Sequence, residues 1–170
     1  GDVYKRQAAR TLGRDARVAV IDWDAHCGGG TASLLDRHDQ YGQVSQYDLS
    51  VSSFDAGYAL GPNRVREIVS GGPARAHDAY LAAAETMLAG VNTDGLGLVV
   101  YNAGMDPHEG AGGPRGITAD TMAAREQMLF AWAASIGVPV AFALAGGYTI
   151  DVTPAELVDL HRLTLTAATA

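Results

Sequence analysis

Short apolar runs alternate along the chain with longer stretches in which apolar residues recur every three or four positions. Residues 17–24 (RVAVIDWD) form a β-branched run that ends in acids, which is typical of a strand buried in a parallel sheet. Further runs predict strands over residues 44–50, 96–102 and 138–144. Helical periodicity predicts helices over residues 31–38, 74–89, from 118 or 120 to 135, and 154–168. This alternation of strand and helix indicates an open α/β sheet.

Capping residues and glycines mark the expected ends of these elements. Thr31 is predicted to be the N-cap of the first helix, and Thr153, followed by Pro154, that of the last. Residues 51–73 are rich in Gly, Ser and Pro and show little periodicity. This stretch is therefore expected to be a long surface loop with no more than one helical turn.

Composition narrows the class of protein. The chain has 170 residues, 48% of them hydrophobic, which is enough for one domain with a real core. A formal net charge of -7 argues against a nucleic-acid partner, because such proteins need a basic face. The single cysteine, Cys27, excludes an internal disulfide. No apolar run is long enough to span a bilayer, so we expect a cytoplasmic protein that does not bind membranes.

The first seven residues need separate treatment. Residues 1–7 (GDVYKRQ) resemble translated adaptor DNA found at the ends of environmental sequence assemblies. We interpret them as a non-native terminus and exclude them from the fold. The domain is then expected to occupy residues 8–170.

Residues able to bind a metal follow two of the predicted strands. Asp24 and His26 come at the end of the first strand, and residues two apart in a strand point to the same side. Asp106 follows the third strand. Any one of these acids alone is more often a cap or turn residue. Together, two carboxylates and one imidazole leave a position open for water, as a catalytic zinc site requires.

Three segments resemble one known family. Residues 22–31 (DWDAHCGGGT) are similar to the metal-binding strand end of the histone deacetylase and acetylpolyamine amidohydrolase family. Residues 101–110 (YNAGMDPHEG) resemble its second metal-binding loop, and Gly146-Gly147-Tyr148 its catalytic-tyrosine turn. The resemblance implies the arginase/deacetylase-like fold, a three-layer, open and mostly parallel sheet. The four predicted strands would lie in the order fourth, third, first, second, and the N-terminal strands of the family would be missing.

The resemblance also implies roles for individual residues. Asp24, His26 and Asp106 would bind Zn²⁺, and Tyr148 would be catalytic, donating a hydrogen bond to the developing oxyanion. Asp22 and Ser50 would face a structural monovalent cation, K⁺. The implied substrate is an acylated amine, either a small molecule such as an acetylpolyamine or an acetyl-lysine protein, from which water removes the acyl group.

Departures from the family pattern leave alternatives open. The family's tandem catalytic histidines are missing, since the chain has no His–His pair and its first histidine is His26. We therefore expect a truncated reading frame with impaired activity. An arginase-like ureohydrolase with two manganese ions is the less favoured alternative, because it needs carboxylates where this chain has Gly28, Tyr101 and Ala103. A third is a non-catalytic α/β remnant. Cys27 is interpreted as a buried packing residue.

Overall fold

A computed structural model of the protein describes residues 16–39 and 42–170. The prediction for residues 1–7 falls outside these ranges. Within them the elements follow one another as β1 (Arg17–Asp22), α2 (Gly29–His38), β2 (Val44–Ser50), β3 (Arg64–Ile68), α3 (Pro73–Ala89), β4 (Leu96–Gly104), α4 (Ala119–Ser135), β5 (Val140–Ala145) and α5 (Pro154–Ala168).

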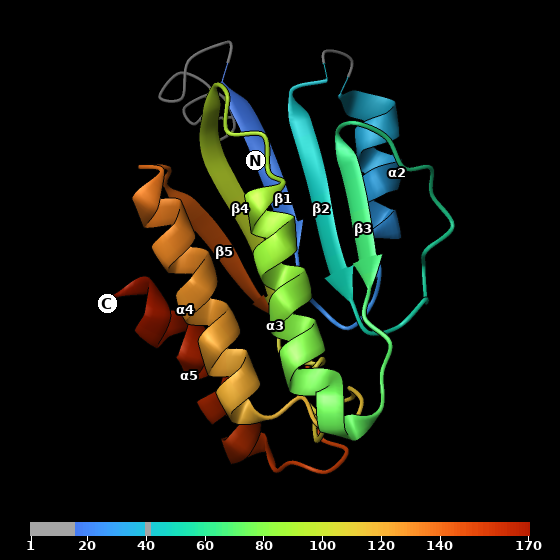
Figure 1. Cartoon of the computed structure of the whole chain (residues 1–170), viewed down its shortest axis with the longest axis vertical. Helices are drawn as coiled ribbons and strands as arrows, with labels where there is room; N and C mark the ends of the chain where they lie inside the picture. The colour runs from blue at the N-terminus through green and yellow to red at the C-terminus, as the bar shows by residue number, and fades with distance from the viewer. Residues whose placement is uncertain (1–15, 40–41) are drawn as a thin grey trace.

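The five strands form one sheet in which every pairing is parallel, in the order β3-β2-β1-β4-β5 (Figure 1). The predicted α/β class is confirmed. So is the expected order of the four predicted strands, because β5, β4, β1 and β2 lie side by side in that sequence. The central position of β1 means that the segment after it is flanked on both sides by the ends of other strands.

The loop predicted for residues 51–73 is wrong in its second half, where β3 forms an edge strand. Arg64 aligns with Gln46 of β2, and Ile68 aligns with Ser50. Three of the five residues of β3 are charged, so the segment lacks the apolar run that marks a buried strand. The segment is a strand because its backbone pairs with β2, and the pattern of apolar residues within the segment does not reveal this pairing.

The prediction that Thr31 caps the first helix is also wrong. The N-cap is Gly28, and the amide of Ala32 donates to the Gly28 carbonyl at 2.9 Å, which closes the first turn before Thr31 can act as a cap. The N-cap predicted at Thr153 is confirmed, and there a capping box joins Thr153 to Glu156. Of the two starts considered for α4, the structure selects Thr118 as the N-cap.

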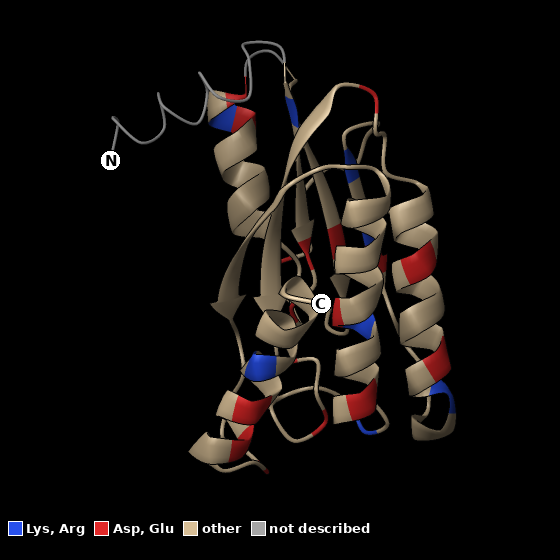
Figure 2. Cartoon of the chain, turned by 90° about the vertical axis from the view of Figure 1, so that its left-hand side faces the viewer, with Lys and Arg blue, Asp and Glu red and all other residues tan. Residues whose placement is uncertain are grey.

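The core lies between the sheet and helices α3 and α4, which cover one face (Figure 1). Helix α2 lies on the opposite side of the sheet (Figure 2). Four aromatic side chains cross the core in edge-to-face contacts: Trp23 contacts Tyr101, Tyr101 contacts Phe130, and Phe130 contacts Phe142. This row connects the end of β1 with the outer strand β5. It also buries Trp23, which lies next to the first candidate ligand, completely.

The first strand is expected to be buried on both faces. Among the described residues, β1 is buried on one face only. Ala19 and Ile21 are buried against the helices, whereas Val18 and Val20 between them are half-buried. On the neighbouring β4, Val100 is exposed as well. The face of the sheet opposite α3 and α4 thus remains partly open beside β1 and β4.

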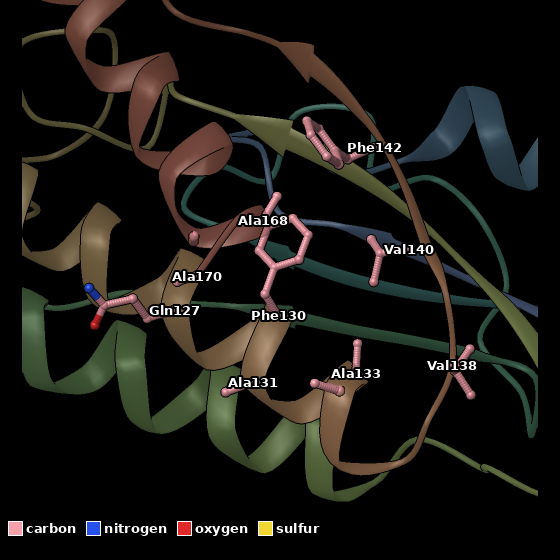
Figure 3. Close-up of a pocket in the computed structure, with 11 residues that line it drawn as sticks. Gln127, Phe130, Ala131, Ala133, Val138, Val140, Phe142, Ala168 and Ala170 are labelled. Carbon is pink, nitrogen blue, oxygen red and sulfur yellow. The ribbon is translucent and has the colours of Figure 1, made fainter.

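An apolar hollow lies between α4, α5 and β5 (Figure 3). Phe130, Val140 and Phe142 line it together with small alanines, and Gln127 is its one polar side chain. None of the candidate ligands lines this hollow. Among the described residues, no helix is long and apolar enough to cross a membrane.

Candidate metal centre

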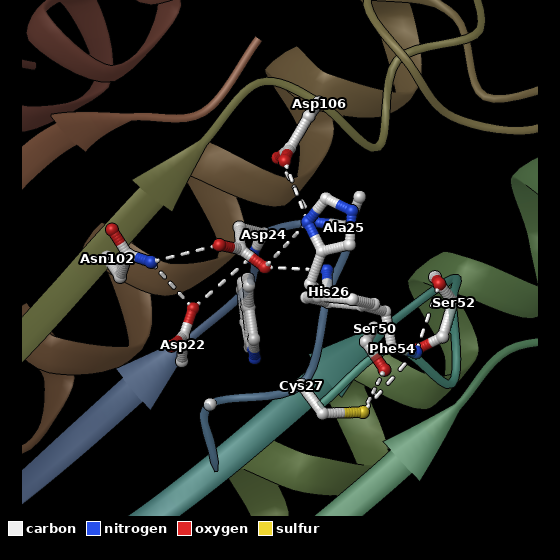
Figure 4. Close-up of polar contacts among 12 residues, drawn as sticks. Asp22, Asp24, Ala25, His26, Cys27, Ser50, Ser52, Phe54, Asn102 and Asp106 are labelled. Carbon is white, nitrogen blue, oxygen red and sulfur yellow. Dashed lines mark hydrogen bonds and ion pairs between the residues drawn. The ribbon is translucent and has the colours of Figure 1, made fainter. Parts of the chain in front are cut away.

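The candidate ligands lie at the carboxyl edge of the sheet (Figure 4). Strand β1 ends at Asp22, and Asp24 and His26 lie in the turn immediately beyond it. Strand β4 ends at Gly104, two residues before Asp106. Because β1 and β4 are adjacent and parallel, their carboxyl ends meet at one edge, which is where open α/β sheets form their sites.

The three predicted metal ligands come together in space. One ligand atom from each of Asp24, His26 and Asp106 lies within 4.8 Å of the other two. His26 Nδ1 is 3.3 Å from Asp106 Oδ2 and 4.0 Å from Asp24 Oδ1. Two ligands of one tetrahedral zinc ion are separated by roughly 3.4 Å when each bond is about 2.1 Å. The donor set and its spacing therefore suit a zinc ion.

Hydrogen bonds fix the carboxylates of this cluster. The amide of Ala25 donates to Asp106 Oδ1 at 3.0 Å, which leaves Oδ2 facing His26. The amide of His26 donates to Asp24 Oδ1 at 2.6 Å. Asn102 Nδ2, at the end of β4, donates to Asp22 Oδ1 at 2.7 Å and more weakly to Asp24 Oδ2 at 3.4 Å. The arrangement is thus held by the backbone and by a neighbouring strand.

The acids here are crowded and removed from water. Burial raises the pKa of Asp24 above its usual range, and the neighbouring Asp106 carboxylate raises it further. Burial, together with the Asp24 charge, raises the pKa of Asp22 to about 7. Buried carboxylates at such short separations repel one another, so a cation bound among them would be strongly favoured.

Tyr148 lies near this edge on the turn after β5. Gly146 has a φ of 65°, and a Cβ there would come within 2.8 Å of Asp106 Cγ, so only glycine lets this turn pass over the ligand. The amide of Tyr148 donates to the Ala111 carbonyl at 2.8 Å, and its ring lies against Gly112. The side chain itself is 53% exposed. The turn thus passes beside Asp106 at Gly146, and Tyr148, two residues further on, is exposed.

The residues predicted to face a structural cation also lie at the carboxyl edge, at the ends of β1 and β2. The hydroxyl of Ser50 is 3.2 Å from Cys27 Sγ, and Asp22 accepts from Asn102. Cys27 is buried, and its Sγ also approaches the Ser52 carbonyl at 3.4 Å. Burial raises the pKa of this thiol. These contacts direct the thiol toward β2 and the loop after it.

Two neighbours of the cluster carry no local signal in the sequence. Phe54 contacts the His26 ring edge-to-face with centroids 5.6 Å apart, yet its side chain is 71% exposed. It lies in the stretch without periodicity, where nothing distinguishes one aromatic residue. Asn102 lies near the end of β4, and only the pairing of β4 with β1 shows that its amide reaches Asp22 and Asp24. Both positions depend on tertiary contacts.

The protein is thus a parallel α/β domain with two carboxylates and an imidazole clustered at the carboxyl edge of its sheet. The chain belongs to the histone deacetylase domain family, which matches residues 6–162.

Individual relatives agree with this assignment. The chain is 29% identical over 139 residues to histone deacetylase 2 of Arabidopsis thaliana, a match that covers 79% of this chain and 35% of that protein. Among solved structures, it is similar to an acetylpolyamine aminohydrolase from Burkholderia pseudomallei, with a TM-score of 0.71 and 21% identity over 96% of this chain and 47% of that one. The HD domain of HDA15 shares the fold with a TM-score of 0.51 and 20% identity, over 99% of this chain and 47% of that one. The chain thus spans about half the length of these structures.

Proposed function

We propose that this chain carries the metal-binding half of a zinc-dependent deacylase that hydrolyses an amide between an acyl group and an amine. Membership of the histone deacetylase family supports amide deacetylation in general. The observation that carries the zinc proposal is the convergence of Asp24, His26 and Asp106 at one edge of the sheet. Two carboxylates and one imidazole are a catalytic zinc set, because they leave coordination positions open.

Zinc bound here would polarise the acyl carbonyl and acidify a water molecule. The protein's own contribution is to hold the ligands in place. The amide of Ala25 keeps one oxygen of Asp106 occupied, so the other oxygen is directed toward the open side of the cluster. Gly146 lets the Tyr148 turn approach closely. The Tyr148 hydroxyl is our candidate hydrogen-bond donor to the oxyanion, a contact that strengthens as charge develops.

Phe54 gives the proposed site an apolar wall. Its exposed ring stands edge-to-face against the imidazole of His26. An aromatic ring in this position suits the alkyl chain of an acylated amine. We therefore propose an acetylated polyamine or an acetyl-lysine side chain as the substrate, the classes named in the solved relative and in the family.

The base that activates water is the part of the mechanism that this chain lacks. None of its five histidines is adjacent to another, so the family's histidine pair has no counterpart in this sequence. General acid–base catalysis is typically worth about 10²–10⁴-fold in rate. We propose that the 170-residue chain hydrolyses its substrate more slowly, by about that factor, than an enzyme with the histidine pair. Zinc and Tyr148 would supply the remaining catalysis.

A structural K⁺ behind the zinc site is a further proposal. Asp22 and Ser50 lie at the ends of adjacent strands, and burial raises the pKa of Asp22, so a nearby cation would stabilise its charged form.

The two-manganese alternative is less well supported by the geometry. Position 28 is a glycine, which supplies no bridging carboxylate, and a Cβ there would come within 2.7 Å of Gln46 Nε2. Ala103 has no side-chain atom that could bind a metal.

Calorimetric titration with zinc tests the proposal. We expect one zinc per chain, and Asp106→Asn should weaken binding by at least about 100-fold. The exposed Asp151, on the loop after Tyr148, provides a matched control, since Asp151→Asn removes the same charge nearby. Hydrolysis of an acetyl-lysine peptide and of an acetylated polyamine should be slow, abolished by a chelator and restored by zinc. Absence of zinc binding, or uptake of two manganese ions per chain, would contradict the proposal.

A further inference from the structure

A fully buried ion pair lies directly beneath the candidate metal centre. Arg125 and Glu126 are adjacent on α4, and both side chains have 0% exposure. Arg125 Nε donates to Glu126 Oε1 at 2.8 Å, and Nη2 donates to the same oxygen. The Tyr101 hydroxyl, from β4, donates to it as well, at 2.7 Å. Glu126 therefore fixes the plane of the guanidinium group.

The other edge of the guanidinium reaches both turns that carry ligands. Nη1 of Arg125 donates to the Trp23 carbonyl at 2.8 Å, and Trp23 is the residue before Asp24. Nη2 contacts Met105 Sδ at 3.9 Å, and Met105 is the residue before Asp106. One planar group thus contacts the Trp23 backbone and the Met105 side chain, and these residues immediately precede two candidate ligands that follow different strands.

The Trp23 carbonyl needs a partner of this kind. Strand β1 ends at Asp22, and Trp23 lies just beyond the regular pairing. Its carbonyl is completely buried with the residue, so without a donor it would be left unsatisfied. The Tyr80 hydroxyl of α3 lies 3.5 Å away, but Arg125 provides the shorter bond.

Burying an ion pair is costly, and apolar residues of similar volume often do as well for stability alone. The contacts of this pair indicate a different use. We propose that Arg125, held in place by Glu126, is a positioning residue for the metal centre. It sets the spacing between the turn of Asp24 and His26 and the turn of Asp106. This inference rests on the proposed zinc site. The hydrogen bond from the Ala25 amide to Asp106 joins the two turns, so its strength reports the spacing between them.

Lysine cannot replace arginine here, because one ammonium group cannot bond Trp23 and Glu126 in the fixed geometry of the fork. In Arg125→Lys we expect zinc affinity to fall about 10–100-fold, as is typical when a group behind the ligands is lost. The absorption spectrum of bound Co²⁺ should change, because the ligand geometry changes. Arg162, exposed on α5 and paired with Asp159, is the matched control. Arg162→Lys should leave affinity and spectrum unchanged.

The double variant Arg125→Met/Glu126→Leu guards against a simple folding defect. It replaces the pair with apolar side chains, a change that such sites often tolerate. The proposal predicts a folded protein with the same loss of zinc affinity. Wild-type zinc affinity and cobalt spectrum in either folded variant would overturn it.

Hydrogen exchange of the metal-free protein separates this inference from the proposed function. Exchange of the Ala25 amide should accelerate in Arg125→Lys, whereas amides in the middle of α2, on the other side of the sheet, should keep wild-type rates. If the wild-type chain takes up no zinc, the proposed function fails, and this exchange measurement still decides whether Arg125 sets the spacing. Unchanged protection of Ala25 would show that it does not.

Discussion

Gly104 lies so close to Asp24 that no side chain fits between them. A Cβ on Gly104 would overlap the Asp24 side chain, lie 2.6 Å from the Asp24 Cα, and come within 2.9 Å of Asp106 Oδ1. The last residue of β4 is therefore in contact with a candidate ligand from each strand. The absence of a side chain at this position allows the two turns to approach each other.

The substitution Gly104→Ala should disrupt both the metal centre and the fold around it. Because the overlapping atoms include the backbone of Asp24, the two turns must separate to make room. We expect zinc affinity to fall more than about tenfold and stability to fall by about 1–3 kcal/mol, as for other overpacked sites. Chelator competition and thermal melting measure the two effects. Gly30→Ala, in open space on α2, is the control and should leave both unchanged or slightly raise stability.

Removal of the thiol at position 27 should leave zinc binding intact. The Cys27 sulfur contacts Ser50 and Ser52, on β2 and the loop after it. Cys27→Ala should therefore bind zinc within about twofold of wild type, at a modest cost in stability from lost packing. Asp24→Ala, three residues earlier, should lose binding in the same titration. A comparable loss in Cys27→Ala would make the cysteine a ligand.

The capping box of α5 predicts a dependence of stability on pH. Hydrogen bonds from the Thr153 amide and hydroxyl lower the pKa of Glu156 below its usual 4.5. A carboxylate with a lowered folded pKa stabilises the protein above the unfolded pKa, and this contribution is lost as the pH falls through the folded value. Wild type should therefore be more stable than Glu156→Gln at pH 7, and the difference should begin to shrink near pH 4.5 and disappear below the lowered folded pKa.

Denaturant titrations across this pH range provide the measurement. Glu85→Gln, at an exposed position on α3, removes the same charge without affecting a helix cap and corrects for net charge. A difference between wild type and Glu156→Gln that persists unchanged well below pH 4 would contradict the capping argument.

The outer strand β5 predicts self-association. It pairs only with β4 in the described sheet, and Leu144 near its end is 44% exposed. An apolar edge of this kind can pair with another chain. We expect the protein to elute at increasing apparent size as its concentration rises, and Leu144→Lys to reduce this effect. Leu165→Lys, on α5 at 47% exposure, is the matched control. A wild-type chain that stays monomeric at all concentrations would refute the prediction.

The sequence predicts most of the fold because its strongest signals are local. Buried parallel strands are apolar runs, and helix ends such as Thr153 carry their own capping residues. The candidate ligands are predictable for the same reason, since they follow two such runs directly. β3 escapes prediction because an edge strand needs only one neighbour and tolerates charge at three of its five positions.

Arg125 and Glu126 could not be assigned from the sequence. Two adjacent charged residues in a helix are usually exposed to solvent. Their burial depends on Tyr101 and Trp23, which lie on other elements and supply the partners for both charges. Phe54 is similar, because its contact with His26 arises only when the loop after β2 folds back to the end of β1. These features are set by tertiary contacts and leave no periodic trace.

The hydrogen bond between Ala25 and Asp106 also constrains how the protein can fold, because it spans 81 residues of chain. β1 pairs with β2 after a short crossover through α2, but its pairing with β4 must wait until the whole segment through α3 has been brought back. Closing so long a loop is slow compared with local structure formation. The candidate ligands therefore meet late in folding. The moment at which the refolding chain first binds an added metal ion would report when β4 pairs with β1.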